Sequence, residues 1–212
     1  VTGGTITAGG TATDNTATIT WNTVGTQTVS VNYTNANNCT AATATVKNIT
    51  VNPLPVPTIT GNAAACKDIA GNIYTTEAGM TGYVWAISGG TITAGGGATD
   101  NTATVTWTVV GAATISVNYT NGNGCTAASA TVKGVTVNAL PVPTLSGPNP
   151  VCVNSTGNVY TTDAGMTNYL WSVTGGTITA GGTFSNTITV TWNAVGAQTV
   201  SVNYTNGNGC TA

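Results

Sequence analysis

The sequence predicts an all-β protein made of tandem β-sandwich domains, about seven strands each, arranged as beads in a rod. A long internal repeat indicates the tandem organisation. Short segments in which apolar and polar residues alternate with a period of two indicate half-buried strands. Stiff proline-rich segments between the repeats indicate domain joints. No stretch has the spacing and caps of an amphipathic helix.

The repeat has a period of 86 residues, because the octapeptide GGTITAGG occurs at 3–10, 89–96 and 175–182. One residue is missing from the third copy after Gly182, so Trp107 corresponds to Trp192. A unit of this length exceeds a solenoid repeat and suits one small autonomous domain. The predicted domains are residues 1–52, the C-terminal part of a truncated sandwich; 53–138, a complete sandwich; and 139–212, a sandwich lacking its last strand.

Alternating segments define the strands and the core. Thr102–Trp107 and Thr114–Thr120 place apolar residues at every second position, with threonine, serine or asparagine between most of them. This pattern is typical of antiparallel strands with one buried face. Seven or so such strands in one repeat fit two packed sheets. The predicted structural core contains Trp21, Trp85, Trp107, Trp171, Trp192, Tyr119 and Tyr204.

Proline-rich segments mark the joints between domains. They lie at 52–57 and 138–143, each carrying Leu-Pro-Val-Pro. Proline fixes φ and removes a backbone donor, so these segments favour extended conformations and cannot continue a sheet. With strands along the array axis rising about 3.3 Å per residue, one unit would span roughly 35–45 Å. The array therefore suits a rod with stiff joints.

Composition excludes several classes of function. Charged residues make up 4% of the chain, there is no histidine, and the formal net charge is −2. A chain with so little positive charge offers no surface for nucleic acid. No apolar run is long enough to span a membrane. With five carboxylates and no histidine, we expect no enzyme activity, no catalytic, cofactor-binding or metal-binding residues, and no cofactor.

Five cysteines fall into two alternating series. Cys66 and Cys152 lie near the start of a unit, whereas Cys39, Cys125 and Cys210 lie near the end of one. Pairing within units predicts the disulfides Cys66–Cys125 and Cys152–Cys210, and it leaves Cys39 unpaired because its partner would lie upstream of a truncated unit. The alternatives are Cys39–Cys66 with Cys125–Cys152, across the joints, or reduced cysteines. Either set of disulfides implies an oxidising, extracytoplasmic compartment.

Two motifs carry a family resemblance. Tyr83-Val-Trp-Ala-Ile-Ser-Gly-Gly90 and the segment Val110–Cys125, which ends in an asparagine-glycine turn, resemble the PKD (polycystic kidney disease) domain. More closely, the units resemble the PKD-like, immunoglobulin-type repeats of very large secreted surface proteins of Bacteroidetes. The aspartates of the usual Trp-Asp-Phe-Gly-Asp-Gly motif are missing here. The resemblance implies an immunoglobulin-like sandwich, extracellular placement and a spacer, adhesive or filament-forming role.

Two further features have competing interpretations. Lys133 alternates in phase with Val135, and each of the two later units carries an acid at a matching place, Glu77 or Asp163. A lysine at the strand edge is the plain interpretation, and an isopeptide bond to a carboxylate or asparagine side chain is the alternative. The aromatic residues could stack on sugars, but their alternation with threonine favours the core. Tyr33, Tyr119 and Tyr204 resemble corner tyrosines that bond to backbone.

The predicted function is mechanical. We expect a stalk or fibre segment of a secreted bacterial surface adhesin or filament that gives reach, stiffness and protease resistance, since trypsin has only three lysines and no arginine to cleave at. The partners would be neighbouring repeats of the same chain. Other copies of the chain in a filament, or surface glycans and host proteins, are the alternative partners.

Overall fold

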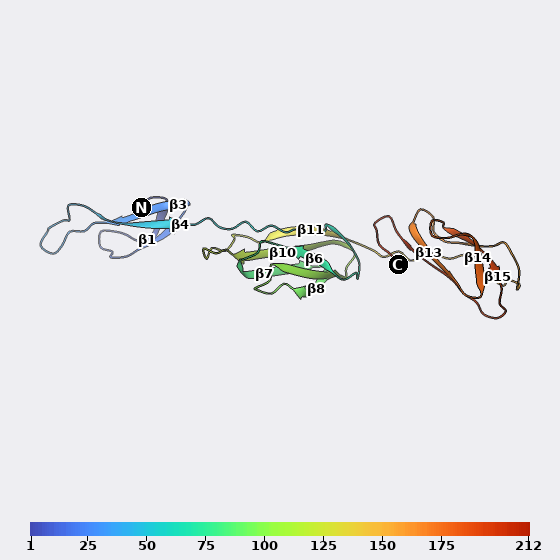
Figure 1. The fold of residues 1–212 in the computed structure, drawn as a ribbon. Helices are drawn as coiled ribbons and strands as arrows, with labels where there is room; N and C mark the ends of the chain where they lie inside the picture. Colours follow the sequence, from blue (N-terminus) through green and yellow to red (C-terminus); the bar gives the residue numbers. More distant parts are fainter.

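The computed structural model describes residues 1–212 and contains sixteen strands and no helix. The strands form three bodies that follow one another along a line, joined by extended segments (Figure 1). The structure contains no helix that is long and apolar enough to cross a membrane. The prediction of an all-β chain of tandem sandwiches is confirmed.

The middle body is the complete sandwich. Its larger sheet has the order β5-β11-β10-β7, and its smaller sheet has the order β6-β9-β8. The strands are β5 (Ala64–Cys66), β6 (Asn72–Thr75), β7 (Thr81–Ser88), β8 (Gly90–Gly95), β9 (Thr102–Trp107), β10 (Gly111–Thr120) and β11 (Thr131–Asn138).

Alternation along β9 and β10 builds the core of this sandwich. In β10, Ile115 and Val117 are fully buried and Tyr119 is 3% exposed, while the residues between them are half-buried or exposed. Trp107 of β9 is fully buried in the opposite sheet and meets the ring of Tyr74 edge-on at 5.9 Å. The period of two therefore produces two apolar faces that pack against each other.

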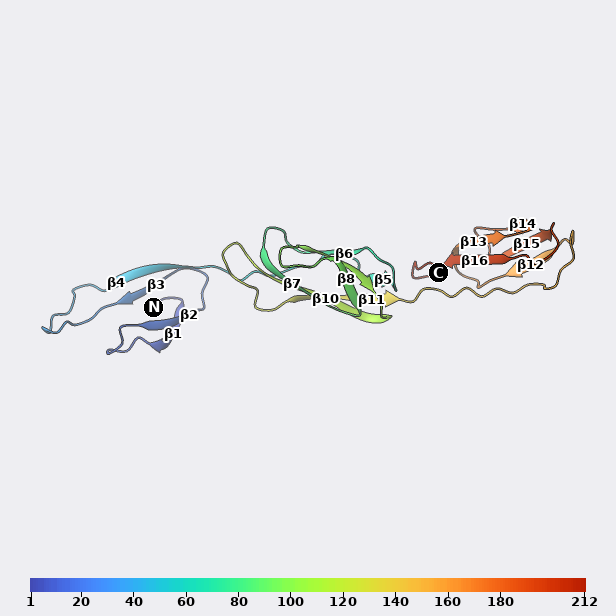
Figure 2. The ribbon, with the colours of Figure 1, turned by 90° about the horizontal axis from the view of Figure 1, so that it is seen from below.

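The direction of strand β5 decides at which end of the middle body Cys66 lies. It runs parallel to β11, with Cys66 opposite Asn138, in a sheet whose other pairs are antiparallel. Because a parallel strand enters its sheet at the same end as its partner, the chain first travels the length of the body before β6 begins. Cys66 therefore lies at the end of the body from which the chain leaves, beside the end of β11 (Figure 2).

The octapeptide GGTITAGG forms an edge strand with a bulge. In β8 the pairing with β9 shifts between Ile92 and Ala94, and Gly95 follows with φ of 65°. A Cβ atom at Gly95 would collide with the backbone oxygen of Thr102. The glycine is therefore required both by its backbone conformation and by the close approach of β9.

The third body repeats the middle one without a counterpart of β11. Its smaller sheet has the order β12-β15-β14, but its larger sheet is reduced to β13-β16. The strands are β12 (Asn158–Thr161), β13 (Thr167–Val173), β14 (Gly176–Gly181), β15 (Thr187–Trp192) and β16 (Val200–Thr205). Trp192 is 4% exposed, whereas Trp171 is half-buried.

The first body contains only two hairpins. The strands are β1 (Gly4–Gly9) paired with β2 (Ala17–Trp21), and β3 (Gly25–Val31) paired with β4 (Thr45–Val51). Trp21 is half-buried here and Tyr33 is 74% exposed. In the middle body, the counterparts of these two aromatic residues are Trp107 and Tyr119, which lie in a sandwich of seven strands. The first body has only four strands, so Trp21 and Tyr33 have fewer neighbours.

Candidate functional site

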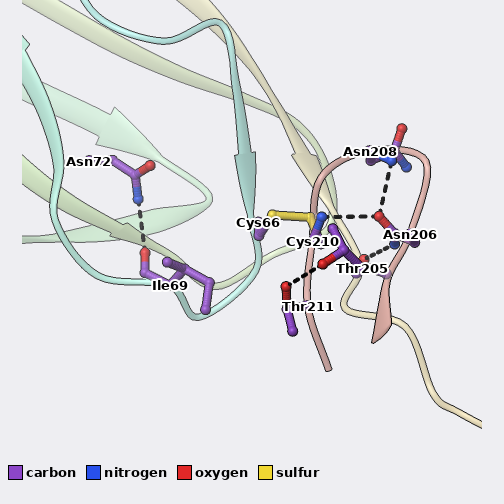
Figure 3. The surroundings of a disulfide bond; sticks show 9 residues. Cys66, Ile69, Asn72, Thr205, Asn206, Asn208, Cys210 and Thr211 are labelled. Carbon is purple, nitrogen blue, oxygen red and sulfur yellow. Dashed lines mark hydrogen bonds between the residues drawn. A yellow bond between two sulfur atoms is a disulfide. The ribbon is translucent and has the colours of Figure 1, made fainter. Parts of the chain in front are cut away.

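A disulfide joins the middle and third bodies. Cys66, the last residue of β5, bonds to Cys210, with a Cα–Cα distance of 5.6 Å and a sequence separation of 144 residues. Figure 3 shows the two cysteines meeting between the end of β5 and the hairpin after β16. Cys210 is 1% exposed and Cys66 is half-buried, so the joint shields the sulfur bridge mainly on the side of the third body. The joint between units is therefore the most distinctive site in the chain.

This bond replaces the disulfides predicted within units. Cys66–Cys125 and Cys152–Cys210 do not form, and Cys39, Cys125 and Cys152 are free thiols. The reason is the path of the chain. Cys66 lies where the chain leaves the middle body, opposite Asn138. The hairpin of Cys125 lies at the other end, where the chain enters the body, and there Asn121 Nδ2 donates to the carbonyl of Pro53 in the incoming segment. The two cysteines of one unit therefore face opposite neighbours.

The hairpin that presents Cys210 is held by one asparagine. The Oδ1 atom of Asn206 accepts hydrogen bonds from the backbone nitrogens of Asn208 at 3.0 Å and Cys210 at 3.1 Å. Its Nδ2 atom donates to the carbonyl of Ala139 in the connecting segment at 3.3 Å. Asn206 thus fixes both the shape of the turn and its position against the joint (Figure 3).

An acidic side chain anchors the connecting segment to each sandwich. In the middle body, Glu77 accepts hydrogen bonds from Thr58 N at 3.1 Å, Thr76 Oγ1 at 2.7 Å and Tyr119 Oη at 3.0 Å. Thr58 ends the Leu-Pro-Val-Pro-Thr segment, so the carboxylate holds the incoming chain against the end of β10. Charge-assisted hydrogen bonds of this kind are stronger than neutral ones.

The third body uses Asp163 in the same way. Its carboxylate accepts from Thr144 N at 2.8 Å, Thr144 Oγ1 at 2.9 Å and Tyr204 Oη at 2.7 Å. The predicted backbone contact of the corner tyrosines is therefore wrong for Tyr119 and Tyr204, whose hydroxyls donate to these carboxylates. Tyr83 and Tyr169 supply the hydroxyl-to-backbone bonds instead, to the carbonyls of Glu77 and Asp163.

These contacts shift the pKa values of all four groups. Burial opposes the ionisation of Glu77, but the hydrogen bonds from Thr58 and Thr76 outweigh it and lower the pKa to about 2. Hydrogen bonds from Thr144 and Tyr204 lower the pKa of Asp163 to about 2. Burial, together with the neighbouring carboxylate, raises the pKa of Tyr119 and Tyr204 to about 12. The carboxylates are therefore structural anions and not proton donors near neutral pH.

Lys133 takes no part in the anchor. It lies opposite Ile115 in the β10–β11 pair and is half-buried. The one ion pair in the structure joins Lys67 and Asp68 at 3.2 Å. Because Glu77 is fully engaged by hydroxyl and backbone donors, the geometry favours the strand lysine over the isopeptide interpretation.

The third body carries an open apolar groove where the middle body carries β5 and β11. The groove has a volume of about 710 Å³, and Val151, Tyr160, Trp192 and Val200 line it. The counterparts of Val200 and Val202 in the middle body are Ile115 and Val117, which are fully buried in β10, where β11 pairs along the edge of that strand. The groove is thus the unfilled strand position of an otherwise similar sandwich.

Other chemistry is sparse. No three His, Cys, Asp or Glu side chains gather as metal ligands. Trp85, Trp107, Trp192, Tyr119 and Tyr204 are all buried, so they offer no flat platform to a sugar ring. The aromatic residues that remain well exposed are Tyr33 at 74% and Phe184 at 93%, on different bodies.

Comparison with known proteins defines the class. Residues 52–133 and 138–212 each match the model of the PKD-like domain. The chain therefore belongs to the PKD-like domain family. A solved structure of Clostridium thermocellum CbhA fibronectin(III)-like modules is similar at 15% identity and a TM-score of 0.36, covering 73% of this chain and 89% of that one. A comparison with curated proteins found no match.

Proposed function

We propose that this chain is a non-enzymatic structural segment, a stalk or fibre, of an extracellular bacterial surface protein such as an adhesin. Its repeats would give reach, stiffness and protease resistance. The observation that carries the proposal is the disulfide between Cys66 and Cys210, which fastens one sandwich to the next. Disulfides persist in oxidising compartments, which supports an extracellular location. The Bacteroidetes surface proteins that the units resemble supply the most direct precedent for such a role.

The disulfide has a mechanical consequence. A pull applied to the two ends of the chain passes along residues 1–66, crosses the sulfur bridge, and leaves through residues 210–212. The residues between the two cysteines carry no tension while the bond is intact. Between Cys66 and Cys210, reach is then set by the bonded joint and not by the resistance of β6 to β16 to unfolding, a property that suits a stalk.

Single-molecule stretching of the whole chain between its termini tests this function. Reduction should release the 144-residue separation, adding about 500 Å of contour length at 3.3–3.6 Å per residue. Cys66→Ser should extend fully without reductant, and Cys39→Ser, which removes a free thiol, should behave as the parent chain. An oxidised chain that already extends to its full contour length would contradict the proposal.

One observation favours a second function, a subunit of a self-assembling filament. The open groove of the third body and the unpaired edge of β16 present the surface that a strand like β11 covers in the middle body. A strand donated by another chain would fill it. Sedimentation of the chain over a range of concentrations separates the two functions, because a filament subunit should form long oligomers and a stalk segment should stay monomeric under non-reducing conditions.

A further inference from the structure

We infer that the disulfide joint is a repeating device: the start cysteine of each unit bonds to the end cysteine of the next. Under this rule Cys152, a start cysteine, bonds to the end cysteine of a further PKD-like unit that follows the third body. Cys125, an end cysteine, bonds to the start cysteine of the preceding unit. Both are free thiols in this chain, where Cys66 and Cys210 are the one pair with both members present. The inference concerns covalent connectivity and does not rest on the proposed location or role.

The end hairpins of the second and third units have the same geometry. Asn121 Oδ1 accepts from the backbone nitrogens of Asn123 and Cys125, both at 3.0 Å, as Asn206 does in the bonded hairpin. Gly124 and Gly209 both have φ of 76°. The thiol of Cys125 is thus presented by the same turn that delivers Cys210 to its partner.

The start cysteines also share one local structure. Two residues after Cys66, Asp68 has φ of 59° and donates its backbone nitrogen to the carbonyl of Trp107 at 2.7 Å. Two residues after Cys152, Asn154 has φ of 61° and donates to the carbonyl of Trp192 at 2.6 Å. Cys152 is therefore placed at the exit end of the third body as Cys66 is placed at the exit end of the middle body.

The first joint independently reproduces the docking of the second. Asn121 Nδ2 donates to the carbonyl of Pro53 at 3.5 Å, as Asn206 Nδ2 donates to Ala139 at 3.3 Å. Each end hairpin therefore packs on the proline-rich segment that enters its own unit. Since that segment comes directly from the preceding unit, the Cys125 hairpin faces the exit end of the first body, the position where a start cysteine would lie.

Overlapping bonds of this register would form a covalent strap along the array. Cys125 and Cys152 are separated by 27 residues, which run as β11 along the middle body and then along the third body to its exit end (Figure 2). Fully extended, 27 residues span about 95 Å. Two units span roughly 70–90 Å by strand rise, so the strap is nearly taut in the folded state. An array stapled in this register could lengthen little without breaking a disulfide.

The chemistry balances with a disulfide oxidant. Two thiols lose two protons and two electrons as the S–S bond forms, and one molecule of oxidised glutathione takes them up and leaves as two molecules of glutathione. The structure supplies the approach of the two sulfurs and the oxidant supplies the electron acceptor.

The test lengthens the whole chain by one period. Ala212 corresponds to Ala127, so repeating residues 128–212 after it adds one joint of natural sequence. The longer chain is folded in a glutathione buffer, its free thiols are alkylated, and it is digested with trypsin and with a protease that cleaves before aspartate. Asp163 lies between Cys152 and Cys210, so the two cysteines are recovered on different peptides.

The expected result is a bond from Cys152 to the added counterpart of Cys210, while Cys66 keeps its bond to Cys210. In the 212-residue chain Cys152 should be alkylated. Cys152→Ser in the longer chain should free only the added counterpart of Cys210, with Cys66–Cys210 intact as an internal check of folding. A bond from Cys152 to Cys210, a bond between the two added cysteines, or a Cys152 that stays alkylated in the longer chain would overturn the inference.

Discussion

The second and third units have closely similar sequences where they overlap, yet the second has a cluster of thirteen buried core residues and the third a cluster of four. The difference traces to β11. In the second unit β11 pairs with β10 at Ile115 and Val117, and both residues are fully buried. In the third unit β16 has no such neighbour, and Val200 and Val202 are half-buried. One strand thus decides whether the same pattern of residues becomes a closed core or the wall of a groove.

Truncating the central tryptophan should produce the largest loss of stability, and a larger loss in the second unit than in the third. Trp107→Ala removes a fully buried ring whose Nε1 donates to Tyr74 Oη, and we expect a loss of about 4 kcal/mol in the free energy of unfolding. Trp192 is buried but its Nε1 has no partner, and it lines the open groove. Trp192→Ala should therefore cost about 2 kcal/mol, because water can enter the space. Urea unfolding of the whole chain measures both.

Equal losses for Trp107→Ala and Trp192→Ala would show that the groove does not weaken the third core. Val84→Ala, at a position on β7 that is 63% exposed, serves as the control and should leave the unfolding midpoint nearly unchanged.

Supplying the missing strand should bring the stability of the third unit close to that of the second. Adding residues 128–138 after Ala212 provides a copy of β11. We expect a gain on the order of 3 kcal/mol for the third unit, since burial of several valines is partly offset by ordering of the new strand. Amide exchange at Val200 and Val202 should slow towards the rates at Ile115 and Val117.

The control extension replaces the counterparts of Val135 and Val137 with threonine, so that the strand keeps its backbone but loses its apolar face. Exchange at Val200 that is unaffected by either extension would refute the assignment of the groove to a missing strand.

The carboxylate anchors should give the smallest difference in stability between the second and third units, because each unit has one. Glu77 and Asp163 have pKa values lowered to about 2 in the folded chain, so each contributes stability that is present above its unfolded pKa and is lost as pH falls towards 2. Tyr119 and Tyr204 have raised pKa values of about 12, so their contribution is present below 10 and is lost as pH rises through 12. Acid and alkaline unfolding of the whole chain should show both limits.

Glu77→Gln should lower the free energy of unfolding of the second unit by about 1 kcal/mol at neutral pH. It should also reduce the further loss of stability of this unit as the pH falls towards 2. It should also lower the pKa of Tyr119, which ultraviolet titration of the phenol reports. Asp100→Asn, in the turn where Asp100 accepts from Gly97 N, is the matched control. A Tyr119 titration that is the same in Glu77→Gln and in the parent chain would remove the carboxylate as the cause.

The sequence alone determined the local structure and the repeat. Alternation along Thr102–Trp107 and Thr114–Thr120 was enough to predict strands and their buried faces, because side-chain direction in a strand follows directly from position. The period of 86 residues was enough to predict tandem domains. The roles of Glu77 and Asp163 were not predicted, although their matching positions in successive units were a usable signal.

Only the tertiary structure decided which cysteines meet. The sequence offered pairs within a unit or across the nearest joint, and the observed bond spans 144 residues and belongs to neither set. The cause is the parallel strand β5, which carries Cys66 to the exit end of its sandwich while the hairpin of Cys125 stays at the entry end. Spacing along a chain cannot show at which end of a folded body a residue lies, because that depends on the direction in which each strand joins its sheet.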